Sequence, residues 1–173
     1  LWASPNIDFV GIDAYFPLTD EVQPILGFSR EDIEKGWSSG EGYDYFYLDP
    51  ENRDGKTLYT DSRFAWKNIY KWWSESHVLP SGENTDWQPK MKKIWFTEYG
   101  FPSVNGCSNQ PNVFVDNSSS YSKFPYYSNG EVDFYAQKVA IDGTLEFWKN
   151  SEMVEIMFLW AWDMRPFPYF PNL

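Results

Sequence analysis

The sequence predicts an α/β fold built on a parallel sheet, and three observations support that prediction. Three apolar segments with the length of β-strands alternate with two segments that have the periodicity of amphipathic helices. Such an alternation implies βαβ units with right-handed crossovers between parallel strands. Two of the strand-like segments also lead into a carboxylate near their C-terminal end, which is where α/β barrels carry catalytic acids.

The expected elements follow one another in a regular order. The expected strands are residues 7–15, 93–98 and 154–160, and the expected helices are residues 62–76 and 131–149. Pro17 ends the first strand, and Gly100 with Pro102 follows the second. In both helices apolar side chains recur mostly at spacings of three and four residues. Strand, helix, strand, helix, strand is therefore the expected order.

Long loops follow the first and second strands. Residues 16–61 are rich in Gly, Tyr, Asp and Pro, and residues 101–130 in Ser, Asn, Pro and Tyr. Such loops lie at the C-terminal face of the strands, where α/β barrels carry function, although disordered insertions would also explain them. Their aromatic content argues against disorder. Residues 80–90 are expected to form an exposed, turn-rich linker on the opposite face.

The length of the chain limits how much of a barrel it can form. A (β/α)8 TIM barrel needs eight strands and typically about 250 residues, whereas only three strands are expected here. We therefore expect residues 1–173 to form a single domain, the C-terminal portion of a (β/α)8 TIM barrel with long loops at the strand C-terminal face. Its upstream strands would be absent or would belong to a longer parent chain.

Composition excludes several classes of function. The net charge of −11 and the pI near 4.4 argue against nucleic-acid binding through phosphate contacts and against direct attraction to anionic lipid. No apolar run approaches the roughly 18 residues of a membrane span. Cys107 and His77 are each the only residue of their kind, which excludes an intrachain disulfide, a histidine-based triad and a multi-histidine metal site. We expect no metal and no cofactor.

Glu98, at the end of the second strand, is the central candidate for catalysis. Aromatic residues make up 21% of the chain, more than its core can bury, so some are expected to line a cleft. A carboxylate in such a cleft suits a sugar, with a second carboxyl about 5–5.5 Å away for a retaining reaction or roughly 6.5–9.5 Å away for an inverting one. The partners considered are Asp13, Glu41, Asp44, Asp49, Asp116 and Asp163. A structural salt bridge from Glu98 to Lys93 or Arg165 is the alternative.

Polar and aromatic residues also end the other two strands. Trp160 and Trp162 lie two residues apart and share a side of the third strand, with Asp163 directly after them. Each tryptophan could form a platform for a sugar or fill the core. Asp13 and Tyr15 share a side at the end of the first strand, where Asp13 could hold a substrate hydroxyl.

Several longer motifs resemble one known family over almost the whole chain. They are Gly40-Glu41-Gly42-Tyr43-Asp44, Trp72-Trp73-Ser74, Ile94-Trp95-Phe96-Thr97-Glu98, Asn109-Gln110-Pro111-Asn112-Val113-Phe114 and Trp160-Ala161-Trp162-Asp163-Met164-Arg165-Pro166-Phe167-Pro168. The chain resembles the TIM-barrel-like domain of gene transfer agent and phage tail-tip proteins. More distantly, residues 8–19 and 95–100 resemble the sixth and seventh strands of clan A-type glycoside hydrolases.

The resemblance implies roles for individual residues. In clan A-type enzymes the nucleophile ends the seventh strand, a position that Glu98 matches, and the acid/base glutamate ends the fourth strand, which nothing here matches. By the same resemblance Tyr15 orients the nucleophile, and Trp160 or Trp162 forms the floor of the sugar site. Tyr99, the residue after Glu98, is also expected to contact the substrate.

Three functions follow from the resemblance and remain open. The first is hydrolysis of a glycosidic bond in peptidoglycan or a surface polysaccharide, to help a bacterial, phage-tail-like particle enter a cell. The second is recognition of such a glycan without turnover. The third is a purely architectural role beside other domains or subunits of the tail. The sequence alone does not decide whether the domain is an enzyme, because only one of the two catalytic carboxylates is matched.

Overall fold

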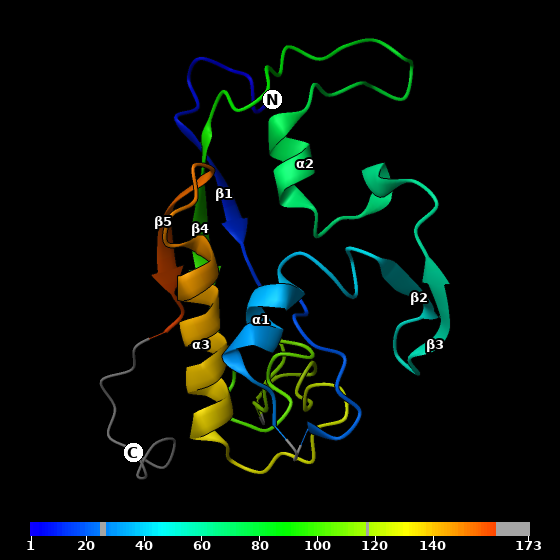
Figure 1. The fold of residues 1–173 in the computed structure, drawn as a ribbon, viewed down its shortest axis with the longest axis vertical. Helices are drawn as coiled ribbons and strands as arrows, with labels where there is room; N and C mark the ends of the chain where they lie inside the picture. The colour runs from blue at the N-terminus through cyan, green and yellow to red at the C-terminus, as the bar shows by residue number, and fades with distance from the viewer. Residues whose placement is uncertain (25–26, 117, 162–173) are drawn as a thin grey trace.

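The computed structural model describes residues 1–24, 27–116 and 118–161. Its strands are β1 (Phe9–Asp13), β2 (Tyr45–Asp49), β3 (Asp54–Leu58), β4 (Lys93–Tyr99) and β5 (Val154–Leu159). Its helices are α1 (Arg30–Gly36), a 3-10 helix (Ser62–Phe64), α2 (Ile69–Ser74) and α3 (Phe134–Trp148). Figure 1 shows β1, β4 and β5 side by side, with the β2–β3 hairpin apart from them.

The main sheet is parallel, with the strand order β1-β4-β5. In its register Val10 lies beside Ile94, and Phe96 lies beside Met157. The prediction of a mixed α/β fold with a parallel sheet is therefore confirmed. The described residues form no closed barrel, so the assignment to the C-terminal portion of a barrel stays a prediction.

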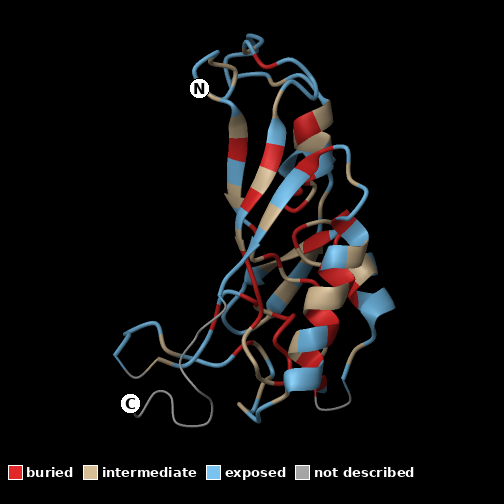
Figure 2. Cartoon of the chain, turned by 90° about the vertical axis from the view of Figure 1, so that its left-hand side faces the viewer, coloured by how far each residue is buried: buried red, intermediate tan, exposed pale blue. Residues whose placement is uncertain are grey.

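The hydrophobic core lies between one face of this sheet and the helices, which all lie on that side in Figure 2. Ile94 and Phe96 of β4 are fully buried there, as is Ala140 of α3. Trp73 of α2 is buried as well, and its indole nitrogen donates a hydrogen bond to the carbonyl oxygen of Lys92 at 2.6 Å. Alternating buried and exposed residues along β4 thus give the sheet one covered face.

The expectation that residues 16–61 form only a long loop is wrong. The segment contains α1 and the antiparallel hairpin β2–β3. α1 has a capping box, in which Ser29 and Asp32 each accept a hydrogen bond from the other's backbone N–H. Only Ile33 anchors α1 in the core, where it packs against Gly143 of α3 so closely that an added Cβ on Gly143 would lie 2.8 Å from it. A helix with one apolar anchor has no periodicity for a sequence pattern to detect.

The helix expected at residues 62–76 is interrupted. The 3-10 helix ends at Phe64, and the ψ of 86° at the next residue, Ala65, lies outside the helical region. α2 begins only after Asn68, whose side chain accepts a hydrogen bond from the backbone N–H of Lys71 at 3.0 Å. The other boundaries agree to within three residues, since α3 covers 134–148 of the expected 131–149 and β1 covers 9–13 of the expected 7–15.

The second face of the parallel sheet is uncovered in the described structure. Phe9 and Trp95 stack there with ring centroids 3.7 Å apart, and Phe158 lies beside Trp95 at 6.2 Å. Phe158 is 49% exposed, and Thr97 and Asp13 on the same face are exposed as well. Parallel sheets are usually covered on both faces, so this apolar surface is unusual for the fold.

Candidate functional site

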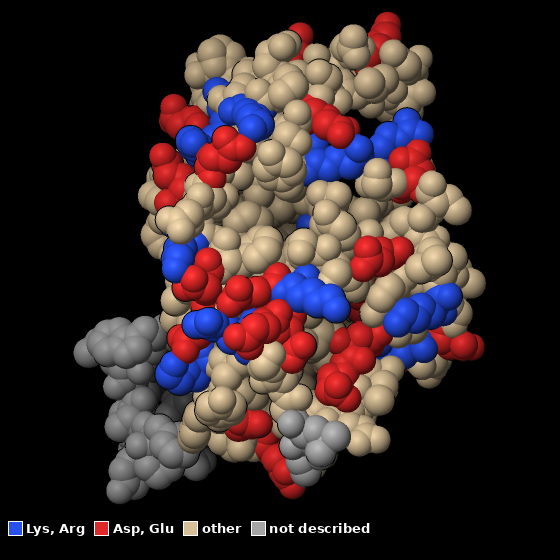
Figure 3. Space-filling view, viewed as in Figure 1, with Lys and Arg blue, Asp and Glu red and all other residues tan. Residues whose placement is uncertain are grey.

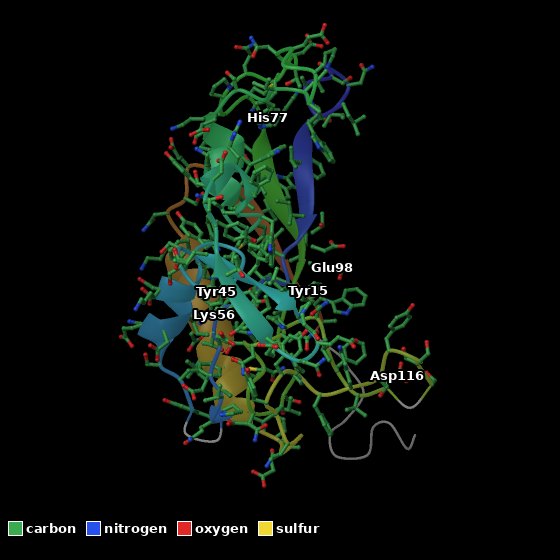
Figure 4. All side chains as sticks on the ribbon, turned by 90° about the vertical axis from the view of Figure 1, so that its right-hand side faces the viewer. Tyr15, Tyr45, Lys56, His77, Glu98 and Asp116 are labelled. Carbon is green, nitrogen blue, oxygen red and sulfur yellow. The ribbon has the colours of Figure 1, made fainter. Side chains whose placement is uncertain are left out.

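The site is built where β1 and β4 end side by side. Asp13 pairs with Glu98 in the register of the two strands, and the backbone N–H of Ala14 donates to the carbonyl oxygen of Glu98 at 2.6 Å. Tyr15, two residues further on, donates a hydrogen bond from its phenol to Oε2 of Glu98 at 2.9 Å (Figure 4). The structure therefore brings together three of the residues that the sequence singled out.

Burial and negative charge keep the Tyr15 phenol protonated. Burial is the main cause of its raised pKa, and the hydrogen bond to Glu98 and the charges of Glu98 and Asp13 raise it further. A tyrosine with a raised pKa remains a hydrogen-bond donor at neutral pH. Tyr15 can therefore fix the orientation of the Glu98 carboxylate.

An irregularity in β4 directs Glu98 toward this site. Thr97 has no partner in β1, since Ile12 pairs with Phe96 and Asp13 with Glu98. Strict alternation would place Glu98 on the same covered face as Phe96, because side chains alternate with a period of two. The extra residue instead lets Tyr99 enter the core and leaves Glu98 partly exposed.

Glu98 forms no ion pair within the described part of the chain. The alternative salt bridge to Lys93 is not formed, because the Lys93 ammonium donates to the backbone carbonyl of Glu152 at 2.6 Å. Arg165, the other expected partner, lies outside the described residues, as do Trp162 and Asp163. Within the described residues, the Glu98 carboxylate accepts one side-chain hydrogen bond, from Tyr15.

A pocket of about 410 Å³ opens at Glu98, and we call it the Glu98 pocket. It is lined by Tyr15, Glu98, Gly100, Phe101, Pro102, Pro111, Asn112, Phe114 and Trp160. Trp160 is 63% exposed and Phe114 is 60% exposed, so both offer ring faces to a ligand. Glu98 is the only carboxylate among these described lining residues. The pocket thus combines one carboxylate with open aromatic surface.

Gly100 allows the backbone of Trp160 to lie close to the end of β4. A Cβ on Gly100 would lie 2.2 Å from the carbonyl oxygen of Trp160, which no side chain could tolerate. The backbone N–H of Trp160 donates to the carbonyl oxygen of Tyr99 at 2.8 Å, which ties the end of β5 to the end of β4. Tyr99 itself is buried in the core and does not line the pocket, so it supports the site from behind.

The loop at residues 101–130 supplies two aromatic residues, Phe101 and Phe114, that were not predicted to belong to the site. Asn109 holds this loop in place. Its side-chain oxygen accepts hydrogen bonds from Thr19 and from the backbone N–H of Glu21, and its amide nitrogen donates to the carbonyl oxygens of Glu21 and Tyr126. The Asn-Gln-Pro-Asn-Val-Phe motif identified this segment as unusual. Its hydrogen bonds join loops that are far apart in the chain, so the local sequence does not predict them.

Of the carboxylates considered as partners, the described ones do not line the Glu98 pocket. Asp13 accepts a hydrogen bond from the Thr97 hydroxyl at 2.8 Å on the uncovered sheet face. Asp44 and Asp49 accept hydrogen bonds from nearby backbone, and Asp116 (Figure 4) accepts them from Ser118. Each of these four carboxylates therefore has a hydrogen-bond partner within the protein.

Glu41 belongs to a separate buried cluster around Arg53. The Arg53 guanidinium pairs with Glu41 at 2.6 Å and with Asp20, and it lies between the rings of Tyr47 and Tyr126 at 4.0 and 4.5 Å. Its side chain is only 4% exposed. The cluster joins the β2–β3 hairpin to the loops that follow β1 and β4.

Charge is distributed without a basic patch on the face shown in Figure 3, where Lys and Arg lie among Asp and Glu. In the described ranges no group of three or more His, Cys, Asp or Glu side chains is placed to hold a metal ion. None of the described helices is long and apolar enough to cross a membrane.

Fold and site together define an α/β domain with a parallel sheet and an aromatic pocket at the strand ends, whose described lining carries one carboxylate, Glu98. The family model for the GTA TIM-barrel-like domain matches residues 1–171. The chain therefore belongs to this family, which associates it with gene transfer agent proteins. No curated protein matches the sequence.

Proposed function

We propose that this chain is a glycoside-hydrolase-like domain of a gene transfer agent tail protein, and that the Glu98 pocket recognises a polysaccharide or peptidoglycan of the cell envelope. The observation that supports this most is the Tyr15–Glu98 hydrogen bond in a pocket lined by the exposed ring of Trp160. Sugar sites combine these features, since a ring face packs on the pyranose and a fixed carboxylate faces the anomeric carbon.

On this proposal Glu98 is the carboxylate that acts at the anomeric carbon. Tyr15 occupies Oε2, which leaves Oε1 without a protein partner in the described structure. A retaining mechanism uses such an oxygen as the nucleophile, while a second carboxyl protonates the leaving oxygen. Asp13, Asp163 and Trp162 remain proposed contacts to the substrate, and Tyr99 acts from the core behind the pocket.

Recognition without turnover is the second candidate, and one observation favours it. Among the described residues that line the pocket, Glu98 has no second carboxylate to serve as general acid. Both candidates use the same aromatic pocket and differ in whether a bond is broken.

We also propose that residues 1–173 are the C-terminal portion of a (β/α)8 barrel. The uncovered face with Phe9, Trp95 and Phe158, and the lack of a described neighbour beyond β1 or β5, support this. In a barrel that face would be interior, and the strands that cover it could carry the missing acid.

Binding to peptidoglycan sacculi tests the proposal. We expect the protein to sediment with sacculi and the Trp160→Ala variant to lose most of this binding. The matched control is Trp2→Ala, because Trp2 is 40% exposed and does not line the Glu98 pocket. Equal sedimentation of all three proteins would contradict glycan recognition at this pocket.

The release of reducing sugar separates the two candidates. Hydrolysis predicts that wild type releases reducing ends and that Glu98→Gln lowers the rate at least about a hundredfold. Recognition alone predicts Trp160-dependent binding without release by either protein.

A further inference from the structure

A second pocket adjoins the Glu98 pocket, and we call it the Phe124 pocket. It has a volume of about 670 Å³ and shares Phe101, Pro102, Phe114 and Trp160 with the Glu98 pocket. Its further described lining comes mainly from the loop at residues 103–130 and from α3. Both volumes fall within the roughly 300–1,000 Å³ of ordinary ligand pockets. A ligand that lies on Trp160 can therefore continue from one pocket into the other.

The described lining of the Phe124 pocket is mainly apolar and carries no charged side chain. Its described lining includes Val104, Val115, Ile141 and Leu159 but no Asp, Glu, Lys or Arg. A group seated there is therefore neutral and carries apolar surface, because an unpaired charge would lose its hydration without a partner.

The wall formed by Phe124 is held in a defined place. Phe124 is 45% exposed and packs over Gly130, where an added Cβ would lie 2.3 Å from the ring. Gly130 also has a φ of +80°, which favours glycine. Close packing and backbone conformation thus both require glycine beneath this ring.

A second part of the lining is held in place by α3. The amide nitrogen of Gln137 donates to the carbonyl oxygen of Phe101 at 2.7 Å, and the backbone N–H of Asp133 donates to the carbonyl oxygen of Ser103 at 2.9 Å. The Gln137 side-chain oxygen and the Ser103 hydroxyl have no described protein partner and belong to lining residues. They offer an acceptor and a hydroxyl for an amide or hydroxyl of a ligand.

We infer that the Phe124 pocket is a second sugar subsite for a neutral, N-acetylated hexosamine, linked to the sugar that occupies the Glu98 pocket. This inference rests on the proposed function. The acetamido methyl group matches the apolar walls and its N–H matches the Gln137 oxygen, while the described lining offers no cation to pair with the carboxylate of a uronic acid. The substrate class is thus a polymer of N-acetylated sugars.

Calorimetric titration with two disaccharides tests the inference. N,N′-diacetylchitobiose and cellobiose have the same linkage and differ in their acetamido groups. We expect diacetylchitobiose to bind about tenfold more tightly, since filling an apolar pocket with one extra small group gives discrimination of this order. Phe124→Ala should remove most of that advantage and change the affinity for cellobiose by less than about threefold.

The control variant is Tyr121→Ala, in the same loop, because Tyr121 is 87% exposed and does not line the pocket. Equal affinity for the two disaccharides, or the same effect of Phe124→Ala and Tyr121→Ala, would overturn the second subsite. If cellobiose binding still depends on Trp160, the proposed function stands in that case. If neither disaccharide binds in a Trp160-dependent way, the proposed function fails together with the inference.

Discussion

At the scale of single residues, hydrogen bonds place the reactive group of the site. Glu98 lies at a strand end, partly exposed, with one oxygen held by Tyr15. The resemblance suggested this pair, but the distance in the chain, 83 residues, gives no local signal for it. The irregularity at Thr97 that directs Glu98 toward the pocket arises from the pairing of β4 with β1 and β5. It could not be predicted from the sequence of β4 alone.

Replacing Tyr15 by phenylalanine tests the role of its hydroxyl. A hydrogen bond to a charged group contributes about 1.5–3 kcal/mol, so Tyr15→Phe should weaken glycan binding or turnover at least about tenfold. The free energy of unfolding should change by less than about 1 kcal/mol, because water can reach the partly exposed carboxylate. Urea unfolding and titration calorimetry would measure the two effects. Unchanged binding would contradict the orienting role.

Lys67 gives a prediction for the dependence of stability on pH. It is buried, donates to the carbonyl oxygen of Pro17 at 2.7 Å, and has its pKa lowered by burial to about 8, although the charges of Glu41 and Asp44 oppose this shift. Between about pH 8 and the ordinary value of 10.5, the unfolded chain holds a proton that the folded protein has lost. Stability therefore rises with pH in this range.

The comparison with Lys67→Met isolates this effect from other titrating groups. Wild type should gain about 1–2 kcal/mol relative to the variant between roughly pH 7.5 and pH 9.5. Urea unfolding at the two pH values measures it. Parallel pH profiles for the two proteins would contradict a lowered pKa at Lys67.

At the scale of elements, the sequence pattern predicted the strands and helices with periodic apolar residues. It missed the elements that are stabilised by contacts between residues far apart in the chain. The strands of the sheet and α3 have clear apolar patterns, and their positions were predicted to within three residues. α1 depends on one buried side chain, Ile33, and on its capping box. The β2–β3 hairpin is fixed by the buried cluster of Arg53, whose partners come from other loops.

The Arg53 cluster should dominate the stability of the hairpin region. Burial alone would raise the pKa of Asp20, but hydrogen bonds from Tyr47, Arg53 and Tyr45 outweigh it and hold the pKa below 3.8. Removal of one partner from a buried ion pair costs about 3–5 kcal/mol, so Arg53→Met should lower the free energy of unfolding by about that amount.

The matched control is Arg63→Met. Arg63 also pairs with an aspartate, Asp61 at 2.5 Å, but its side chain is 75% exposed. Exposed pairs contribute about 0–1 kcal/mol, so this variant should unfold almost as wild type does. Similar losses in the two variants, measured by urea unfolding, would show that burial does not set the strength of the Arg53 cluster.

At the scale of the whole molecule, the described residues cover the parallel sheet on one face only. The uncovered face carries Phe9, Trp95 and Phe158, and the described strands leave the outer edges of β1 and β5 unpaired. Sheets of this kind are ordinarily buried on both sides. The proposed barrel would cover this surface. The sequence predicted that further strands are required, because three strands cannot close a barrel.

The uncovered face predicts the behaviour of the 173-residue chain in solution. Phe158→Ser should reduce binding of a hydrophobic dye and change the free energy of unfolding by less than about 1 kcal/mol, because Phe158 is 49% exposed. Met157→Ser, on the covered face, should cost about 2 kcal/mol or more. Equal costs for the two variants would show that both faces of β5 are covered.

A crystal structure with a β-1,4-linked tetrasaccharide of N-acetylglucosamine tests the central claim most directly. Our account predicts one sugar stacked on Trp160 with its anomeric carbon facing Glu98, and a neighbouring sugar against Phe124. A glycan bound on another surface, with both pockets empty at saturating concentration, would contradict it.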